Sequence, residues 1–319
     1  MIGTLEKGAT LEGATVLIVK KSEATTKRGS PYLTLDVRDK TGTISGKFWD
    51  YNPAEHSWIK EGDVAVVSGP VEEYQGNLQL VIKRVDPSLE SPDKFAKSSR
   101  FGVEEMWTDL VALTATFQEP LTKFVTEEIL LKQEPFIEAF KKAPAARSVH
   151  NAWFGGLLEH VHALCTIAEP VIQHYRTRYC EKLSRDKVLF GLIMHDAGKV
   201  IEYDFSNPSF PTSPVGQFTN HLVVGPAWVY EKANLFPNKG PDFKIERAHL
   251  MHVLAAHHGQ LEWGSPVKPA SLEAILVHHL DNLDSKVMHA MDFVLGKKGP
   301  TPHFSAQSYF EKTPYYQYD

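Results

Sequence analysis

The stretch VLFGLIMHDAGK, residues 188–199, organises the second half of this chain. Apolar residues continue almost without a break up to His195, so we expect a helix that is buried on nearly all sides and that Gly198 ends as a C-cap glycine. The adjacent pair His195 and Asp196 would then lie deep in the protein. An unpaired carboxylate there costs on the order of several kcal/mol, and a bound cation is one of the few partners that offset this cost. A His-Asp hydrogen bond that faces solvent is the alternative.

Further histidines and carboxylates recur along the second half of the chain. Together with that pair they make seven candidate metal ligands: His160, His195, Asp196, His221, His257, His258 and Asp281. Imidazole nitrogen and carboxylate oxygen bind borderline divalent ions, and an aspartate beside a histidine can bridge two of them. A lone histidine on an apolar helix is more often a buried core residue. The ordered set, with its pair placed where an apolar helix stops, favours a metallohydrolase site.

Residues 1–88 show the period-two alternation of β-strands. Expected strands lie at 15–19, 32–37, 43–49, 64–69 and 78–82, with a hairpin turn at 39–42. Five strands in about 75 residues suit a small closed barrel with the strand order of an OB-fold. A polar, proline-bearing stretch without periodicity, residues 89–100, would link this barrel to a second domain, residues 101–319.

Aromatic and basic side chains are interleaved along the expected barrel strands. Tyr32, Lys47 and Trp49 belong to this mixture, which suits single-stranded nucleic acid because bases stack on aromatic rings and cations follow the phosphates. The alternative is that the aromatic rings fill the barrel and the cations form a solvated face. Since side chains alternate along a strand, Trp49 and Tyr51 should share one face while Phe48 points to the other.

After residue 100 the apolar period becomes helical. Pro120 and Pro135 each open a helical segment near its first turn. Longer helices are expected at 154–175, 185–197, 221–234, 243–258 and 270–295, and we find no strand-like run among them. The fold class is therefore multidomain, with a small all-β OB-fold barrel followed by an all-α domain.

Composition and charge exclude several classes of protein. The 319 residues are 42% hydrophobic and 23% charged, as in ordinary globular proteins. The formal net charge of −5 argues against a large basic surface for duplex nucleic acid. Neither Cys165 nor Cys180 belongs to a Cys-x-x-Cys pair, and no apolar run approaches the roughly 18 residues of a membrane span. We therefore expect a cytoplasmic protein that does not enter a membrane.

The ligand series resembles the HD-domain superfamily of metal-dependent phosphohydrolases, in which helices surround one or two divalent ions. The stretches YLTLDVRDKTG (32–42), GGLLEH (155–160) and SPVKP (265–269) are similar to those of the YhaM-type 3′-to-5′ exoribonucleases, which carry an OB-type domain ahead of an HD domain. The resemblance covers residues 10–295. It implies an exonuclease that binds single-stranded RNA or DNA on the barrel and removes nucleotides from its 3′ end at an HD-type helical domain.

The resemblance also implies a two-ion site with ligands at defined positions of this chain. The first ion would be held by His160, His195, Asp196 and Asp281. Asp196 would bridge to a second ion held by His221 and His257. Ions so placed activate water and clamp the phosphoryl oxygens. Manganese is the ion we expect first, although cobalt, iron, magnesium and zinc suit the same mixed ligands.

Catalytic and substrate-binding roles follow for further side chains. Asp196 would be the central catalytic residue. Lys199 would be catalytic by neutralising a phosphate oxygen or, alternatively, would complement the dipole at a helix C-terminus. The substrate-binding candidates are His150, Asn151, His258, Tyr32, Lys47 and Trp49. The first three of these could instead hold a metal-binding imidazole in its tautomer.

One segment departs from the family's usual pattern. Asn220 stands before His221 where a glycine is expected, after the proline-rich loop 207–218. Thr219 or Asn220 can still accept an early amide of the following helix. The length and prolines of the loop could reshape the pocket, which leaves strand length and base preference open.

Three functions remain in competition. The first is the exoribonuclease, or a more general single-strand exonuclease. The second is an HD-type phosphohydrolase acting on nucleotides or other small phosphate esters, with the barrel serving oligomerisation or regulation. The third, a nucleic-acid-binding protein without activity, does not explain the intact ligand series. A protein distinguishes RNA from DNA by a contact to the 2′-hydroxyl, and no residue type in a sequence predicts such a contact.

The C-terminal segment 309–318 is rich in tyrosine. Leaving such an aromatic segment exposed would be costly. We expect it to pack on a neighbouring subunit, forming a homo-oligomer, or back on its own domain.

Overall fold

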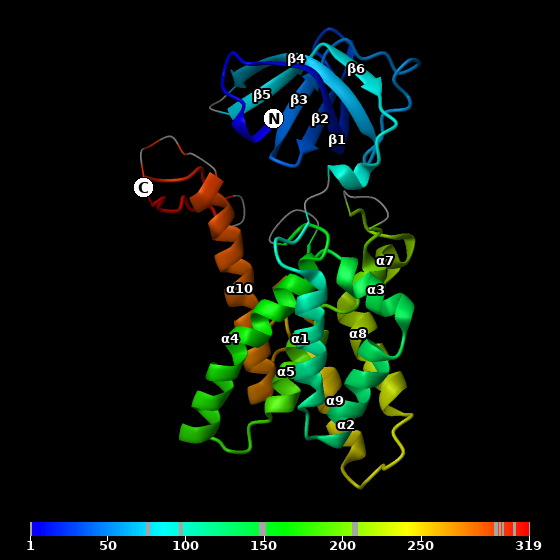
Figure 1. Ribbon diagram of the computed structural model, residues 1–319, viewed down its shortest axis with the longest axis vertical. Coiled ribbons are helices and arrows are strands. Elements are labelled where there is room, and N and C mark those ends of the chain that lie inside the picture. Colours follow the sequence, from blue (N-terminus) through cyan, green and yellow to red (C-terminus); the bar gives the residue numbers. More distant parts are fainter. Residues whose placement is uncertain are drawn as a thin grey trace. The chain divides into compact units, whose positions relative to one another are not determined.

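The computed structural model describes residues 2–74, 77–95, 98–146, 151–205, 210–296, 299, 301, 303–308 and 311–318. The chain forms two compact units (Figure 1). The first comprises Met1–Lys97 with Phe205–Pro211, and the second comprises Ser98–Asp204 with Thr212–Asp319. None of the described helices combines the length and the apolar character that crossing a bilayer needs.

The first unit is a closed β-barrel. Its strands are β1 (Thr10–Thr25), β2 (Pro31–Asp39), β3 (Gly42–Phe48), β4 (Val64–Tyr74), β5 (Asn77–Ile82) and β6 (Arg84–Pro87), with short helical turns η1 (Ile2–Thr4) and η2 (Pro92–Lys94). The hydrogen-bonded order is β1-β2-β3-β5-β4-β6, and β1 also pairs with β4, which closes the barrel. The β3–β5 pair is parallel, whereas the other pairs are antiparallel. The predicted OB-fold barrel is thereby confirmed.

Alternation along the strands fills this barrel with apolar side chains. On β2, Leu33, Leu35 and Val37 are fully buried, each separated from the next by a partly exposed residue. Closure also needs a glycine, because a Cβ on Gly69 of β4 would lie 2.0 Å from the backbone oxygen of Val81. The strand pattern thus specifies both the core and the point where the two strand backbones approach closely.

The prediction that Trp49 and Tyr51 share a face is wrong. Trp49 is 45% exposed, while Tyr51 is only 8% exposed and Phe48 is buried as well. Strand β3 ends at Phe48, so strict alternation no longer applies to the two later aromatic residues. The chain turns after the strand and brings Tyr51 into the core cluster of the barrel.

The second unit is helical. Its elements are α1 (Val103–Ala115), α2 (Pro120–Thr126), η3 (Glu127–Leu131), α3 (Glu134–Lys142), α4 (Gly156–Arg178), α5 (Arg185–Met194), α6 (Lys199–Glu202), α7 (Pro214–Phe218), α8 (His221–Ala233), α9 (Phe243–Ala255), η4 (Leu261–Trp263) and α10 (Leu272–Gly296). The five long predicted helices are confirmed, with ends shifted by a few residues. In the described part of this unit, β-structure is limited to isolated bridges. Residues 207–209 of the proline-rich loop lie outside the described residues, and its later part forms α7.

Helix α5 is the core helix of this unit. Its residues from Val188 to Met194 are all buried. Its neighbours approach so closely that a Cβ on Gly191 would lie 2.4 Å from a side-chain carbon of Val253 on α9 and 2.6 Å from one of Val277 on α10. The apolar stretch therefore forms a helix buried on all sides, as its sequence predicts.

The predicted role of Gly198 as a C-cap glycine is wrong. Helix α5 ends at Met194, and Gly198 has φ −64° rather than the left-handed conformation of a C-cap glycine. The glycine is required for a different reason, since a Cβ there would lie 2.7 Å from the Cα of His221. Helix α8 begins against this glycine, which brings His221 close to the His195-Asp196 pair.

The described part of the C-terminal segment packs back against the end of α10. Nε2 of Gln317 donates to the backbone oxygen of Phe293 at 2.9 Å, and the rings of Phe293 and Tyr315 are 5.9 Å apart. The described part of the segment therefore packs on its own domain, and the homo-oligomer stays a prediction. Tyr318 remains 80% exposed.

Candidate metal centre

Five helices of the second unit bring the seven candidate ligands together. His160 lies in the second turn of α4, the His195-Asp196 pair follows α5, and His221 is the first residue of α8. The remaining residues, His257, His258 and Asp281, follow α9 or lie on α10. Most of them are almost completely buried, including Asp196 at 3% exposure. The solvent-facing His-Asp pair, the alternative left open by the sequence, is therefore excluded.

Asp196 presents its two carboxylate oxygens to different histidines. Its Oδ2 lies 3.3 Å from Nε2 of His195. Its Oδ1 lies 3.4 Å from Nε2 of His221 and 3.8 Å from Nε2 of His257. A carboxylate in this arrangement can bridge two cations, one on each side.

Asp281 completes the side of the centre that contains His160. Its Oδ1 lies 3.1 Å from Nε2 of His160 and 3.6 Å from Nε2 of His195. His160, His195 and Asp196 form one group with ligand atoms all within 4.8 Å of one another. These residues make a mixed imidazole and carboxylate set of the kind that divalent ions favour.

The second group consists of three histidines, His221, His257 and His258. Nε2 of His258 lies 3.4 Å from Nε2 of His221, and Nδ1 of His258 lies 2.9 Å from the backbone oxygen of Trp263. The sequence made His258 one of the seven candidate ligands and also suggested a substrate contact or a supporting role. The geometry places it among the candidate ligands.

Backbone carbonyls orient two of the central imidazoles. Nδ1 of His195 lies 2.9 Å from the oxygen of Leu192, and Nδ1 of His257 lies 2.6 Å from the oxygen of Leu254. A carbonyl only accepts, so each Nδ1 carries the hydrogen and each neutral ring presents a lone pair at Nε2. Both contacts reach back three residues, which fixes the rings where their helices end.

Carboxylates orient two further imidazoles. Nδ1 of His160 lies 2.7 Å from Oδ2 of Asp284, and Nδ1 of His221 lies 2.6 Å from Oε2 of Glu202. Neither carboxylate was singled out from the sequence. Asp284 follows Asp281 by one helical turn, a signal that could have been noticed, whereas Glu202 is 19 residues from its partner and nothing local connects the two. Such partners orient metal ligands and raise their basicity.

Glu202 also provides the cap that the sequence assigned to Thr219 or Asn220. Asn220 occupies the N-cap position of α8, but its side chain makes no capping hydrogen bond. Oε2 of Glu202 instead accepts from the backbone N–H of His221 at 2.8 Å. The same oxygen therefore holds both the first amide of the helix and the imidazole of its first residue.

Two buried nitrogens test whether metal ions fit this centre. Nε2 of His195 and Nε2 of His257 make no hydrogen bond within the described residues, although both are enclosed. His195 lies within ion-pair distance of Asp196, but the contact does not have hydrogen-bond geometry. Buried polar atoms are normally satisfied. A cation facing these lone pairs would satisfy them, so the residues present fit divalent metal ions.

The electrostatics of the centre keep Asp196 and His257 in their metal-binding forms. Burial alone would raise the pKa of Asp196, but the charge of Lys199 lowers it well below its ordinary value. Burial and the neighbouring His195 lower the pKa of His257 well below 6.5. His160 differs: burial lowers its pKa, but hydrogen bonds to Asp281 and Asp284 raise it to about 9.

Lys199 is committed to contacts inside the protein. Its Nζ donates to Oδ2 of Asp196 at 2.6 Å and to the backbone oxygen of Ala145 at 2.6 Å. Burial would lower the pKa of Lys199, but the charge of Asp196 raises it. Lys199 opens α6, so the alternative role at a helix C-terminus is not observed. The ammonium group instead holds Asp196 in place.

The other substrate-binding candidates lie in two places. Asn151 precedes α4, is 2% exposed and has a left-handed backbone (φ 51°). His150 lies outside the described residues. On the barrel, the rings of Tyr32 and Trp49 are 4.6 Å apart, and Nζ of Lys47 lies 5.0 Å from the centre of the Tyr32 ring. The three barrel candidates thus form one aromatic and basic cluster, which we name the Tyr32–Lys47–Trp49 cluster.

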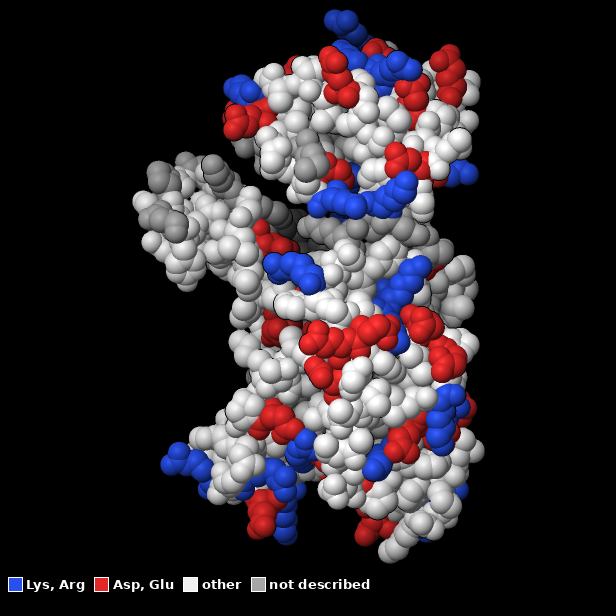
Figure 2. All heavy atoms as spheres, viewed as in Figure 1, with Lys and Arg blue, Asp and Glu red and all other residues white. Residues whose placement is uncertain are grey.

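Charged side chains of both signs are spread over each unit on the face shown in Figure 2. This agrees with the moderate formal charge of −5. Nucleic acid would have to be held locally, by stacking and a few cations, because long-range attraction needs a large excess of one sign.

Two family models match the chain. The model of the OB-fold nucleic acid binding domain (tRNA_anti-codon) matches residues 15–87, and the model of the HD domain matches residues 157–286. Together with the barrel and the clustered His and Asp side chains, these matches define a metal-dependent phosphohydrolase of the HD class that carries an OB-fold.

Curated relatives define the family more narrowly. A protein of Geobacillus sp. (strain WCH70) named 3′-5′ exoribonuclease YhaM is 30% identical over 290 residues, covering 89% of this chain and 85% of the relative. A protein of the same name from Halalkalibacterium halodurans is 30% identical and covers 89% and 86%. A third, from Bacillus velezensis, is 28% identical and covers 94% and 93%. The chain therefore belongs to the YhaM family.

Proposed function

We propose that this protein is a metal-dependent 3′-to-5′ exoribonuclease that acts on single strands. A water oxygen forms a bond to the phosphorus of the last phosphodiester, and the bond from that phosphorus to the 3′ oxygen of the preceding nucleotide breaks. The proton released by the water ends on that 3′ oxygen, and a nucleoside 5′-monophosphate leaves. The observation that carries the proposal is the division of the Asp196 oxygens between two groups of buried imidazoles.

Two divalent ions would complete the centre, with manganese the first candidate. One would be held by His160, His195, Asp196 and Asp281. The other would be held by Asp196, His221, His257 and His258. When bound, such ions supply Lewis-acid activation of water and of the phosphoryl oxygens.

The surrounding side chains hold the ligands in position. Lys199 fixes Asp196 through its 2.6 Å hydrogen bond, so we assign it a positioning role. Asp284 and Glu202 hold Nδ1 of His160 and of His221, which directs Nε2 of each ring to the centre. Preorganised ligands lower the reorganisation needed when substrate and ions bind.

The Tyr32–Lys47–Trp49 cluster is proposed to bind the single strand. Trp49 is 45% exposed and can take a stacked base, worth about 1–3 kcal/mol. Lys47 also donates to Oγ1 of Thr34 at 2.6 Å, which holds its ammonium group beside the rings. A strand held by stacking and one local cation suits a barrel with balanced charge.

Cleavage assays with 5′-labelled single-stranded RNA, single-stranded DNA and mononucleotides test this function. The unmodified protein should shorten RNA from its 3′ end with manganese but not with a chelator. Asp281→Ala should remove this activity, whereas Asp292→Ala, an exposed position on the same helix α10, should leave it unchanged. Hydrolysis of mononucleotides alone would refute the exonuclease and favour the small-molecule phosphohydrolase.

A further inference from the structure

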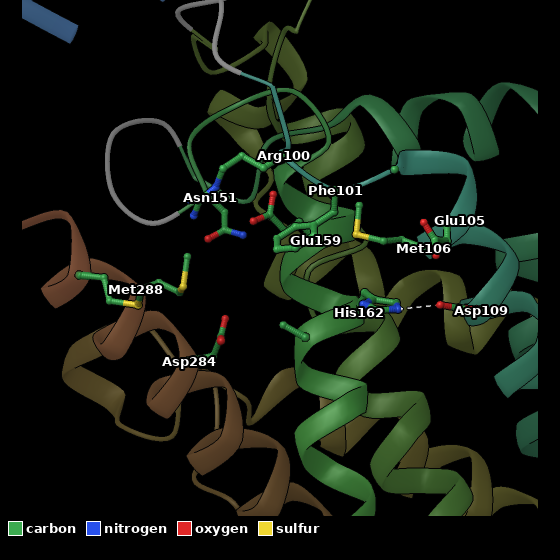
Figure 3. Close-up of a pocket in the computed structure, with 13 residues that line it drawn as sticks. Arg100, Phe101, Glu105, Met106, Asp109, Asn151, Glu159, His162, Asp284 and Met288 are labelled. Atoms are coloured by element: carbon green, nitrogen blue, oxygen red, sulfur yellow. Dashed lines mark hydrogen bonds and ion pairs between the residues drawn. The ribbon is translucent and has the colours of Figure 1, made fainter. Parts of the chain in front are cut away.

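A cavity of about 440 Å³ lies beside the metal centre, within the helical unit. It is enclosed by α1, α4, α10 and the segments that precede α1 and α4 (Figure 3). Its volume falls in the range of small-molecule sites. Of the residues discussed above, Asp284 and the substrate-binding candidate Asn151 belong to its wall.

The cavity combines soft apolar surfaces with carboxylates. Met106, Met288, Met291 and Phe101 provide the apolar part. Thioethers adapt their shape to a flat ring and make favourable contacts with it. Carboxylates outnumber cationic side chains in the lining, as Glu105, Asp109, Glu159 and Asp284 accompany Arg100. Such a lining disfavours a phosphate and favours a neutral, planar ligand that donates hydrogen bonds.

Asn151 places a buried, unsatisfied acceptor in the wall of this space. Its side chain points into the cavity toward Asp284 and Met288 (Figure 3). The amide Nδ2 donates to the backbone oxygen of Gly156 at 3.3 Å, which fixes the orientation of the amide group. Oδ1 of Asn151 is buried and has no hydrogen-bond partner among the described residues. A ligand that donates one hydrogen bond would satisfy it.

His160 separates the cavity from the metal centre. Its Nε2 faces Asp281 in the centre, and its Nδ1 contacts Asp284 in the cavity wall. The cavity therefore lies on the Nδ1 side of the His160 imidazole, and the metal centre lies on its Nε2 side.

We propose that this cavity receives the base of the 3′-terminal nucleoside of the strand, while its 5′ phosphate lies at the metal centre. The inference rests on the proposed function. The base packs against the methionine side chains, and one of its N–H groups donates to Oδ1 of Asn151. Each of the four RNA bases has such a donor on its Watson–Crick edge. The cavity therefore accepts any base, whereas a strand that ends in an abasic ribose makes none of these contacts.

Filling the cavity tests the assignment. Ala163, half-buried on α4, lines the cavity, and Ala163→Leu would occupy the space of the base. Ala290→Leu is the matched control, because Ala290 is half-buried on α10 and is not part of the lining. Met288→Ala, which removes one wall, is the second variant in case the first does not fold. Thermal unfolding reports on the fold of each protein.

The substrates are two RNA strands that differ only at the 3′ end, one complete and one with an abasic terminal ribose. In the unmodified protein and in Ala290→Leu, kcat/KM for the abasic strand should be lower by about tenfold to a hundredfold, from the loss of one stacked base. In Ala163→Leu and Met288→Ala this difference should shrink towards one. An abasic end that is cleaved as well as a complete one in the unmodified protein would overturn the inference.

A binding experiment separates this inference from the proposed function. A strand that ends in 2-aminopurine should change its fluorescence on binding to the unmodified protein and to Ala290→Leu, but not to Ala163→Leu. The same change in all three would contradict the assignment. A protein that shortens no strand but shows this pattern would refute the exonuclease and keep the cavity. Equal inhibition of the unmodified protein and Ala163→Leu by adenosine would also count against it.

Discussion

Replacing Glu202 by alanine should weaken the binding of one metal ion and leave the other in place. Oε2 of Glu202 accepts two hydrogen bonds from one residue, His221, at 2.8 Å from its backbone nitrogen and 2.6 Å from Nδ1. Without it the imidazole loses both its orientation and the acceptor that keeps hydrogen on Nδ1. Nε2 of His221 would then no longer be held toward Asp196.

The size of the effect follows from these two bonds. Removing a carboxylate that orients a metal-binding histidine costs about 10- to 100-fold in affinity, or about 1.4–2.8 kcal/mol. Loss of the cap on α8 should also lower the free energy of unfolding by about 1 kcal/mol. Glu202→Gln keeps an oxygen acceptor, so it should recover most of the affinity of the second ion.

Isothermal titration of the metal-free protein with Mn²⁺ measures both sites, and elemental analysis counts the ions retained. Glu231→Ala is the matched control, since Glu231 is 63% exposed on the same helix α8. The expected result is two tight ions in the control and one in Glu202→Ala. Two ions bound with unchanged affinity in Glu202→Ala would refute the positioning role, as would equal loss of both.

Four further results are expected. Asp196→Ala should lose both ions together, measured by elemental analysis, because its oxygens face both groups of histidines. Manganese affinity should rise with pH up to about 9 and be accompanied by proton release, because the pKa of His160 is raised to about 9 and the ion must displace that proton. Trp49→Ala should weaken single-stranded RNA binding by about 1–3 kcal/mol in a fluorescence titration, whereas Tyr175→Ala, an exposed ring on α4, should not. Burial raises the pKa of Glu273, but contacts with His249 and Ser184 lower it to about 2. In the metal-free protein, Glu273 should therefore add to the free energy of unfolding above pH 4.5, and this contribution should be lost as the pH falls towards 2. Chemical unfolding of Glu273→Gln should lack this pH dependence.

Local patterns predicted the architecture well. The alternation of Leu33, Leu35 and Val37 shows the inner face of a barrel strand, and each of them is fully buried. The unbroken apolar run that ends at His195 predicted a core helix, which α5 is. Such patterns succeed because period and burial are linked within a single element.

The order of histidines and aspartates predicted that a buried polar centre would form. The family resemblance also implied how the centre divides, with Asp196 between two ion sites. His258 was one of the seven candidate ligands but was not assigned to either ion, and it lies in the second group of candidate ligands. Gly198 was read as a helix cap, whereas it makes room for the backbone of His221. The error at Gly198 arose because its contact is with a segment that is distant in the sequence.

Residue order and periodicity were thus sufficient to identify the two folds and the side chains that meet in the candidate metal centre. The packing of helices settled which carboxylate supports which imidazole: Asp284 is 124 residues from His160, and Glu202 is 19 residues from His221. A hydrogen bond acts over about 3 Å in space, whatever the separation along the chain. Local sequence therefore predicts the ligands, while their partners, and the cavity behind His160, depend on how α4, α8 and α10 pack around α5.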